Sequence, residues 1–184
     1  MIRWPGTVSA AILSGTGQES PFLLALGSLI CKLACKFLGP TGHSSLVYNL
    51  SLGAYNKQFK PNRTSADWIC RDEAVVDAYL KDPFCSFQPT VGLFRDMMDG
   101  LHPIADPAQL RRMDPSTPVY LFSGDHDPVG QNGAGVQKVA GFFRDAGCTD
   151  VTVKLYPGGR HEMLNERNKD EVYQDVLQWL EAKL

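Results

Sequence analysis

The sequence predicts an α/β protein built on a parallel sheet, because three short apolar runs alternate with helical stretches. The apolar runs are 8–13 (VSAAIL), 119–122 (VYLF) and 151–156 (VTVKLY). A helical stretch lies between the last two runs at about 133–146, and another follows at 169–184. Strands that alternate with helices at this spacing are typical of parallel βαβ units.

Each apolar run stops at residues that favour turns. The runs are followed by Ser-Gly-Thr-Gly at 14–17, Ser-Gly-Asp at 123–125 and Pro-Gly-Gly at 157–159. Short apolar runs with such ends indicate buried strands. The two helices should each present one apolar face to the sheet. These faces consist of Val136, Val139, Ala140 and Phe143 in the first helix, and Val172, Val176, Leu177, Leu180 and Leu184 in the second.

The middle of the chain, about 21–113, predicts a mostly helical insertion between the first and second strands. Its apolar periodicity is helical and is interrupted by X-Pro pairs at 39–40, 60–61, 82–83 and 102–103. The insertion is rich in aromatic residues, namely Phe59, Trp68, Tyr79, Phe84, Phe87 and Phe94. Two interpretations stay open: a second packed layer, or a lid that forms an apolar pocket.

Composition argues against a nucleic-acid partner and against a disulfide-rich protein. The 184 residues include 18 Lys+Arg and 20 Asp+Glu, so the net charge of −2 gives no electrostatic reason to expect a nucleic acid. The five cysteines are scattered and odd in number, which argues against a disulfide framework. Cys31 and Cys35 are expected to be buried thiols. The first residues lack a leader pattern, so we expect a cytoplasmic protein.

The apolar run 22–38 contains Lys32 and Lys36, so a membrane span is not the expected structure. It would either pack in a core or rest on a lipid surface.

Two loops place chemically useful side chains after neighbouring strands. The first contains Asp125 and Asp127, and the second contains His161, 34 residues after Asp127. Ligands of open α/β sheets bind at the carboxyl ends of strands. An imidazole beside a carboxylate is a common general base. Alternatively, the Asp side chains only cap a turn and the histidine is a surface residue. An acid followed by a histidine matches the end of the order Ser…Asp…His.

Several segments resemble the serine α/β-hydrolases of the lysophospholipase, monoacylglycerol lipase or S33 type. They are LFSGDHDPVG (121–130), LYPGGRHEMLNE (155–166) and the last helix, with AAILSGTG (10–17) as the strand after the nucleophile helix and 55–87 as a helical cap. The resemblance implies a partial α/β-hydrolase fold, with residues 1–20 and 114–184 in the core and 21–113 as the cap.

The same resemblance implies roles for individual residues. Asp127 would be the triad acid and His161 the general base, whereas Asp125 would hold the turn. Arg160 and Glu162 would hold the histidine loop. The substrates would be carboxylic esters with acyl chains, such as lysophospholipids or monoacylglycerols, and neither a cofactor nor a metal is implied.

The nucleophile of this family, a serine in a G-x-S-x-G turn, has no counterpart in the 184 residues. The nearest string is Gly42-His43-Ser44-Ser45-Leu46, in which Leu46 replaces the second glycine. We therefore expect the C-terminal half of a hydrolase that does not cleave esters by itself. The free edge of its first strand would need a cover, and a missing N-terminal half is one candidate partner.

Two rival interpretations come from other classes. The string Asp125-x-Asp127-x-Val129 fits the D-x-D-x-[TV] pattern of Mg²⁺-dependent haloacid-dehalogenase-type phosphatases. Two residues separate Asp125 from the predicted strand, and only 57 residues follow Asp127, which is short for that class. The other rival is a non-catalytic fragment that binds lipid through its cap, or binds a partner half.

Overall fold

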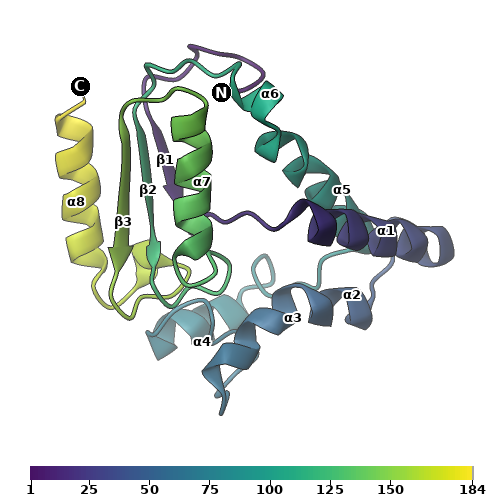
Figure 1. Ribbon diagram of the computed structural model, residues 1–184. Helices are drawn as coiled ribbons and strands as arrows, with labels where there is room; N and C mark the ends of the chain where they lie inside the picture. The colour runs from purple at the N-terminus through teal and green to yellow at the C-terminus, as the bar shows by residue number, and fades with distance from the viewer. Residues whose placement is uncertain (184) are drawn as a thin grey trace.

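The computed structural model, which describes residues 1–183, contains a three-stranded parallel sheet on one side, with the helices of the insertion beside it (Figure 1). The strands lie in the order β1 (Ala11–Ser14), β2 (Val119–Gly124) and β3 (Val151–Tyr156). The residue opposite Ala11 in β1 is Val119 of β2, which in turn pairs with Val151 of β3. The parallel sheet and the α/β class predicted from the sequence are confirmed.

Where each strand begins and ends is set by its pairing with the neighbouring strand rather than by the length of its apolar run. β1 begins at Ala11 and not at Val8, because the amide of Ala11 donates to the carbonyl of Pro118, directly before the first residue of β2 (2.9 Å). β2 continues two residues beyond the predicted end, since Ser123 and Gly124 pair with the end of β3. β3 has the predicted bounds.

Helices α7 (Ala134–Asp145) and α8 (Lys169–Glu181) cover opposite faces of the sheet. Side chains alternate along β2, so its odd-numbered residues Val119 and Leu121 pack against α7, and its even-numbered residues pack against α8. β2 is buried along its whole length. The buried residues on the α8 side are Tyr120, Phe122, Tyr156, Met163, Val172 and Trp179.

The apolar face predicted for α8 is partly wrong. Val172 is buried as expected, but Leu177 is 49% exposed, because five residues further along a helix the side chain has turned by about 140°. Trp179, seven residues after Val172, returns to the buried face and stacks on Tyr120 with ring centroids 5.4 Å apart. The predicted member Leu184 lies outside the described residues.

The insertion is helical, as predicted, and the described residues between β1 and β2 include no strand. Side chains of Ser20, Ser44, Asp72, Thr90 and Asp106 cap the first residues of five of its helices. The α-helices are α1 (Pro21–Leu38), α2 (Ser45–Leu50), α3 (Leu52–Tyr55), α4 (Glu73–Lys81), α5 (Val91–Leu101) and α6 (Pro107–Leu110), with 3₁₀ turns at Asn56–Phe59 and Pro103–Ala105.

Helix α1 packs on one side only. Its buried residues include Leu24 and Cys31, and the hydroxyl of Ser28 donates to Asp99 of α5 (2.6 Å). The helix is long and apolar enough to cross a membrane by length and composition, and the other helices within residues 1–183 do not meet that test. From the sequence, this run was expected either to pack in a core or to rest on a lipid surface. In the structure, one face of the helix is packed and the other is exposed.

Candidate active site

The carboxylate of Asp127 lies at the end of β2 and is inaccessible to solvent. Its Oδ2 accepts a hydrogen bond from the hydroxyl of Ser123, the penultimate residue of β2 (2.8 Å). Its Oδ1 accepts one from the amide of Val129 (2.9 Å), so the side chain also closes its own turn. Two donors therefore fix the direction in which the carboxylate points.

His161 follows β3 and meets Asp127 from the neighbouring loop. Its Nδ1 lies 3.0 Å from Oδ2 of Asp127. Within residues 1–183, Nε2 of His161 makes no hydrogen bond. The ring packs against Trp68 of the insertion, with centroids 5.2 Å apart. The structure thus brings together the two residues predicted as acid and base, one from each loop.

Glycines allow the two loops to approach each other. A Cβ atom at Gly124 would lie 1.9 Å from the carbonyl oxygen of Gly159, so only a bare backbone fits there. The amide of His126 donates to that same oxygen (3.0 Å). Gly15, at the end of β1 with φ of +61°, faces the ring of His161, and a Cβ there would lie 2.7 Å from Nδ1. The close approach of three loops therefore shapes the site.

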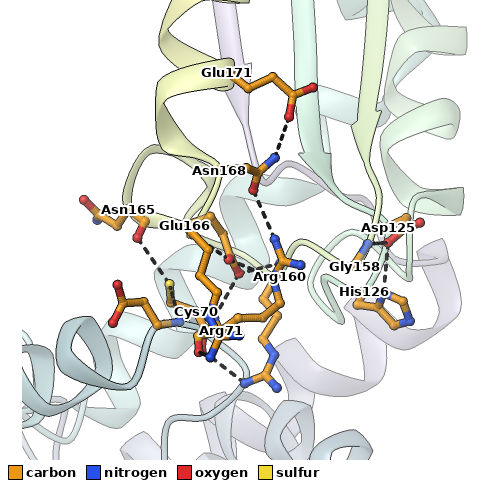
Figure 2. Close-up of polar contacts among 12 residues, drawn as sticks. Cys70, Arg71, Asp125, His126, Gly158, Arg160, Asn165, Glu166, Asn168 and Glu171 are labelled. Carbon is orange, nitrogen blue, oxygen red and sulfur yellow. Dashed lines mark hydrogen bonds and ion pairs between the residues drawn. The ribbon is translucent and has the colours of Figure 1, made fainter.

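Asp125 has a different surrounding from Asp127. Its Oδ1 accepts a hydrogen bond from the amide of Gly158 (2.6 Å) and lies 2.9 Å from Nδ1 of His126 (Figure 2). The bond from Gly158 ties the turn that contains Asp125 to the loop after β3, in agreement with the turn-holding role that the resemblance implied. β2 ends at Gly124, so Asp125 directly follows its strand, contrary to the sequence-based argument against the phosphatase class.

The residues around the pair include several that the sequence did not identify. Ser123 and Gly15 contact the pair directly, and Trp68 comes from the insertion. Tyr55 packs on Trp68 with centroids 5.2 Å apart. Burial, with smaller contributions from Glu19 and Asp127, raises the pKa of Tyr55, so its phenol stays neutral.

The resemblance implied that Arg160 and Glu162 hold the histidine loop, and of these two only Arg160 ties the loop to the insertion with its side chain. The guanidinium of Arg160 donates to the backbone carbonyls of Asp67 and Cys70 in the insertion. The carboxylate of Glu162 accepts instead from Asn165 in its own turn (2.8 Å). The buried carboxylate in this loop is that of Glu166, which the sequence did not single out.

Other features predicted or weighed from the sequence lie elsewhere. The hydroxyl of Ser44 caps α2 by accepting from the amide of Val47 (3.3 Å). A cavity of about 760 Å³ lies beside α6 and α7 and is lined by residues such as Leu13, Met113 and Phe142, and neither Asp127 nor His161 borders it. Among residues 1–183 there is no cluster of three acidic, histidine or cysteine side chains suited to a metal.

A parallel sheet with an acid after one strand and a histidine after the next is typical of α/β-hydrolases. Residues 1–168 match the family described as serine aminopeptidase, S33, and the chain belongs to that family. Because the chain belongs to this hydrolase family, the interpretation as a haloacid-dehalogenase-type phosphatase is wrong.

Known relatives support the same fold. The chain is 29% identical to a monoacylglycerol lipase of Mycolicibacterium smegmatis, and the match covers 99% of this chain and 56% of that protein. A thermostable carboxyl esterase from Bacillus coagulans has a TM-score of 0.85 and 27% identity, with 96% of this chain and 57% of the esterase covered. A lipase in an open form has a TM-score of 0.81 and 25% identity, with 100% and 60% covered. The chain thus spans little more than half the length of these relatives.

Proposed function

We propose that this chain supplies the acid and the general base of a serine hydrolase that cleaves carboxylic esters with acyl chains. The observation that supports this most directly is the contact of His161 Nδ1 with buried Asp127 at 3.0 Å. Family membership and the similarity to a monoacylglycerol lipase and a carboxyl esterase support the ester class. Monoacylglycerols and lysophospholipids are the substrates that we propose.

In the proposed reaction, the Asp127 carboxylate accepts a hydrogen bond from Nδ1–H of His161, which keeps the proton on Nδ1 and leaves Nε2 as the basic nitrogen. Nε2 takes the proton from a serine hydroxyl while the serine oxygen attacks the ester carbonyl. The imidazolium then gives this proton to the departing alkoxide, and the acyl group stays on the serine until water removes it. Asp127 stabilises the imidazolium throughout, because its charge is buried beside Nδ1.

We further propose that the nucleophile comes from residues outside these 184, since no G-x-S-x-G string occurs among them. β1 pairs with β2 on one side and has no second strand beside it in the described part of the chain. A strand from an N-terminal half would fit this free edge. The alternative is a non-catalytic fragment that binds a partner half or lipid.

A chimaera tests the catalytic proposal. The part of the M. smegmatis lipase outside its region of similarity would be joined to this chain, and hydrolysis of a short-chain nitrophenyl ester measured. We expect Asp127→Asn and His161→Gln to lower kcat by a factor of about 10³–10⁴. His126→Gln, at an exposed neighbouring histidine, is the matched control and should keep the activity. An active chimaera that tolerates both substitutions would contradict the assigned roles.

The chain by itself gives the complementary result. Intact mass spectrometry after treatment with a fluorophosphonate should show no adduct, because the reagent needs an activated serine. An adduct would place the nucleophile within the 184 residues, and peptide mapping would identify it.

We also propose a lipid contact through α1. Its exposed apolar residues recur at helical spacing on one side, at Phe22, Leu26, Leu29, Leu33 and Phe37. Such a stripe binds a bilayer surface in proportion to its apolar area. The chain should sediment with phosphatidylcholine vesicles, and a Leu29→Gln, Leu33→Gln double variant should remain in solution. Phe84→Gln, at an exposed residue outside α1, is the control; equal sedimentation of all three proteins would contradict the contact.

A further inference from the structure

The carboxylate of Glu166 joins two segments of the chain, one in the insertion and one in the loop that contains His161. The residue as a whole is only 1% exposed. Oε1 accepts from the backbone amides of Arg71 and Arg160, both at 3.0 Å. Oε2 accepts from Nε of Arg71 (2.9 Å) and from the amide of Arg167 (3.0 Å). Figure 2 shows Glu166 between Arg71 of the insertion and Arg160 of the histidine loop.

Further contacts bind the same two segments, 67–71 and 158–168. The amide of Glu162 donates to the carbonyl of Ile69 (2.9 Å), and the guanidinium of Arg167 donates to the carbonyl of Arg71 (2.9 Å). The guanidinium of Arg160 lies 4.1 Å from the ring centre of Phe59. The residues on both sides of His161 are therefore held by the insertion, which also packs Trp68 on the imidazole.

An ionised carboxylate is the group that suits this site. All four partners of Glu166 are N–H donors, two on each oxygen, so the site requires acceptors only. One donor belongs to a guanidinium, which gives a charge-assisted bond to the buried carboxylate. A glutamine would turn an amide NH₂ toward two of the donors and leave Arg71 without its counter-charge.

We propose that Glu166 is a positioning residue for His161. It fixes the loop after β3 against segment 67–71, so that Nδ1 of His161 meets Oδ2 of Asp127. This inference rests on the proposed function, in which that contact orients the general base. Glu166 acts through the amide of Arg160, next to His161 in the chain, and has no contact with the reacting atoms.

The test measures the Asp127–His161 contact itself in the purified 184-residue chain. A proton shared between Nδ1 and a carboxylate gives a low-field NMR signal, which would be assigned by its loss in Asp127→Asn and His161→Gln. Glu166→Gln should remove this signal while the amide of Leu121 in β2, the internal reference, keeps its exchange rate. Glu166→Asp keeps the charge and should retain part of the signal. Glu162→Gln, in the same loop, is the matched control and should leave it unchanged.

A second variant covers the case in which Glu166→Gln does not fold. Arg71→Met removes one donor to Glu166 and keeps the backbone amide, so we expect the Nδ1 proton to exchange with water about tenfold faster. An unchanged signal and exchange rate in the folded variants would overturn the inference. Absence of the signal from the unsubstituted chain would overturn both the inference and the proposed pair. An inactive chimaera with the signal intact would count against the proposed function alone.

Discussion

Gly15→Ala should separate His161 from Asp127. A Cβ at this position would lie 2.7 Å from Nδ1 and 2.8 Å from Cε1 of His161, whereas an ordinary contact begins at 3.4 Å. The ring would have to retreat by about 0.7 Å, the difference between 3.4 and 2.7 Å. If it moves away from Asp127, the hydrogen bond of 3.0 Å then exceeds the usual limit for such bonds. A bond to a charged group contributes about 1.5–3 kcal/mol.

The substitution also strains the backbone, because Gly15 has φ of +61°. A left-handed conformation costs an alanine about 1–2 kcal/mol. Gly147→Ala is the matched control, since Gly147 is a left-handed glycine at the C-terminal end of α7 with φ of +100°, and the nearest atom to its Cβ position lies at an ordinary 3.7 Å. We therefore expect Gly15→Ala to lower the free energy of unfolding by about 1.5–3 kcal/mol more than Gly147→Ala does.

Urea denaturation measures both free energies, and the low-field Nδ1 proton signal reports the contact directly. The signal should disappear in Gly15→Ala and persist in Gly147→Ala. Equal destabilisation by the two substitutions, together with an unchanged signal, would refute the argument that Gly15 makes room for the histidine.

Two further substitutions test the surroundings. Ser123→Ala removes a buried donor to Asp127 (2.8 Å) and should lower the free energy of unfolding, measured in urea, by about 1–3 kcal/mol. Ser9→Ala, at an exposed serine, is the control and should change this free energy by less than about 0.5 kcal/mol. Equal effects of the two substitutions would contradict the role of the Ser123 hydroxyl. Asp175→Asn tests pH dependence. Burial raises the pKa of Asp175, but hydrogen bonds from Lys154 and Tyr156 outweigh it and hold the pKa below 3.8. The ionised Asp175 therefore stabilises the fold above about pH 4, and this contribution is lost as the pH falls through the folded-state pKa. The difference in unfolding free energy between the unsubstituted chain and Asp175→Asn should accordingly shrink in acid. A difference that grew in acid would contradict the lowered pKa of Asp175.

The sequence predicted the strands well where an apolar run and a turn signal agreed. β3 has its predicted bounds because the run 151–156 stops at Pro157, which cannot continue a ladder. The start of β1 was wrong because pairing, not hydrophobicity, sets it: Val8 is apolar, but β2 begins only after Pro118. In α8, Trp179 could have been found from its spacing of seven residues to Val172.

The two residues of the candidate pair could be placed from strand order and resemblance, whereas their supports could not. Ser123, Gly15 and Trp68 belong to three separate segments, and each is ordinary in its local sequence. Gly15 had one signal, since a Ser-Gly-Thr-Gly turn after a strand favours positive φ. Its contact with His161, 146 residues later, requires the fold.

Glu166 shows why a buried residue that supports the site is difficult to predict from local composition. It lies in the run Asn-Glu-Arg-Asn-Lys-Asp-Glu at 165–171, which has the character of a solvated surface segment. Two N–H donors of Arg71 and two amides of its own loop surround its carboxylate and bury it. These four donors compensate the burial of this charge, because an unpaired buried carboxylate is strongly destabilising. The loop around His161 and the insertion are therefore coupled through Glu166, so loss of one of its donors in either segment should reach the Asp127–His161 contact.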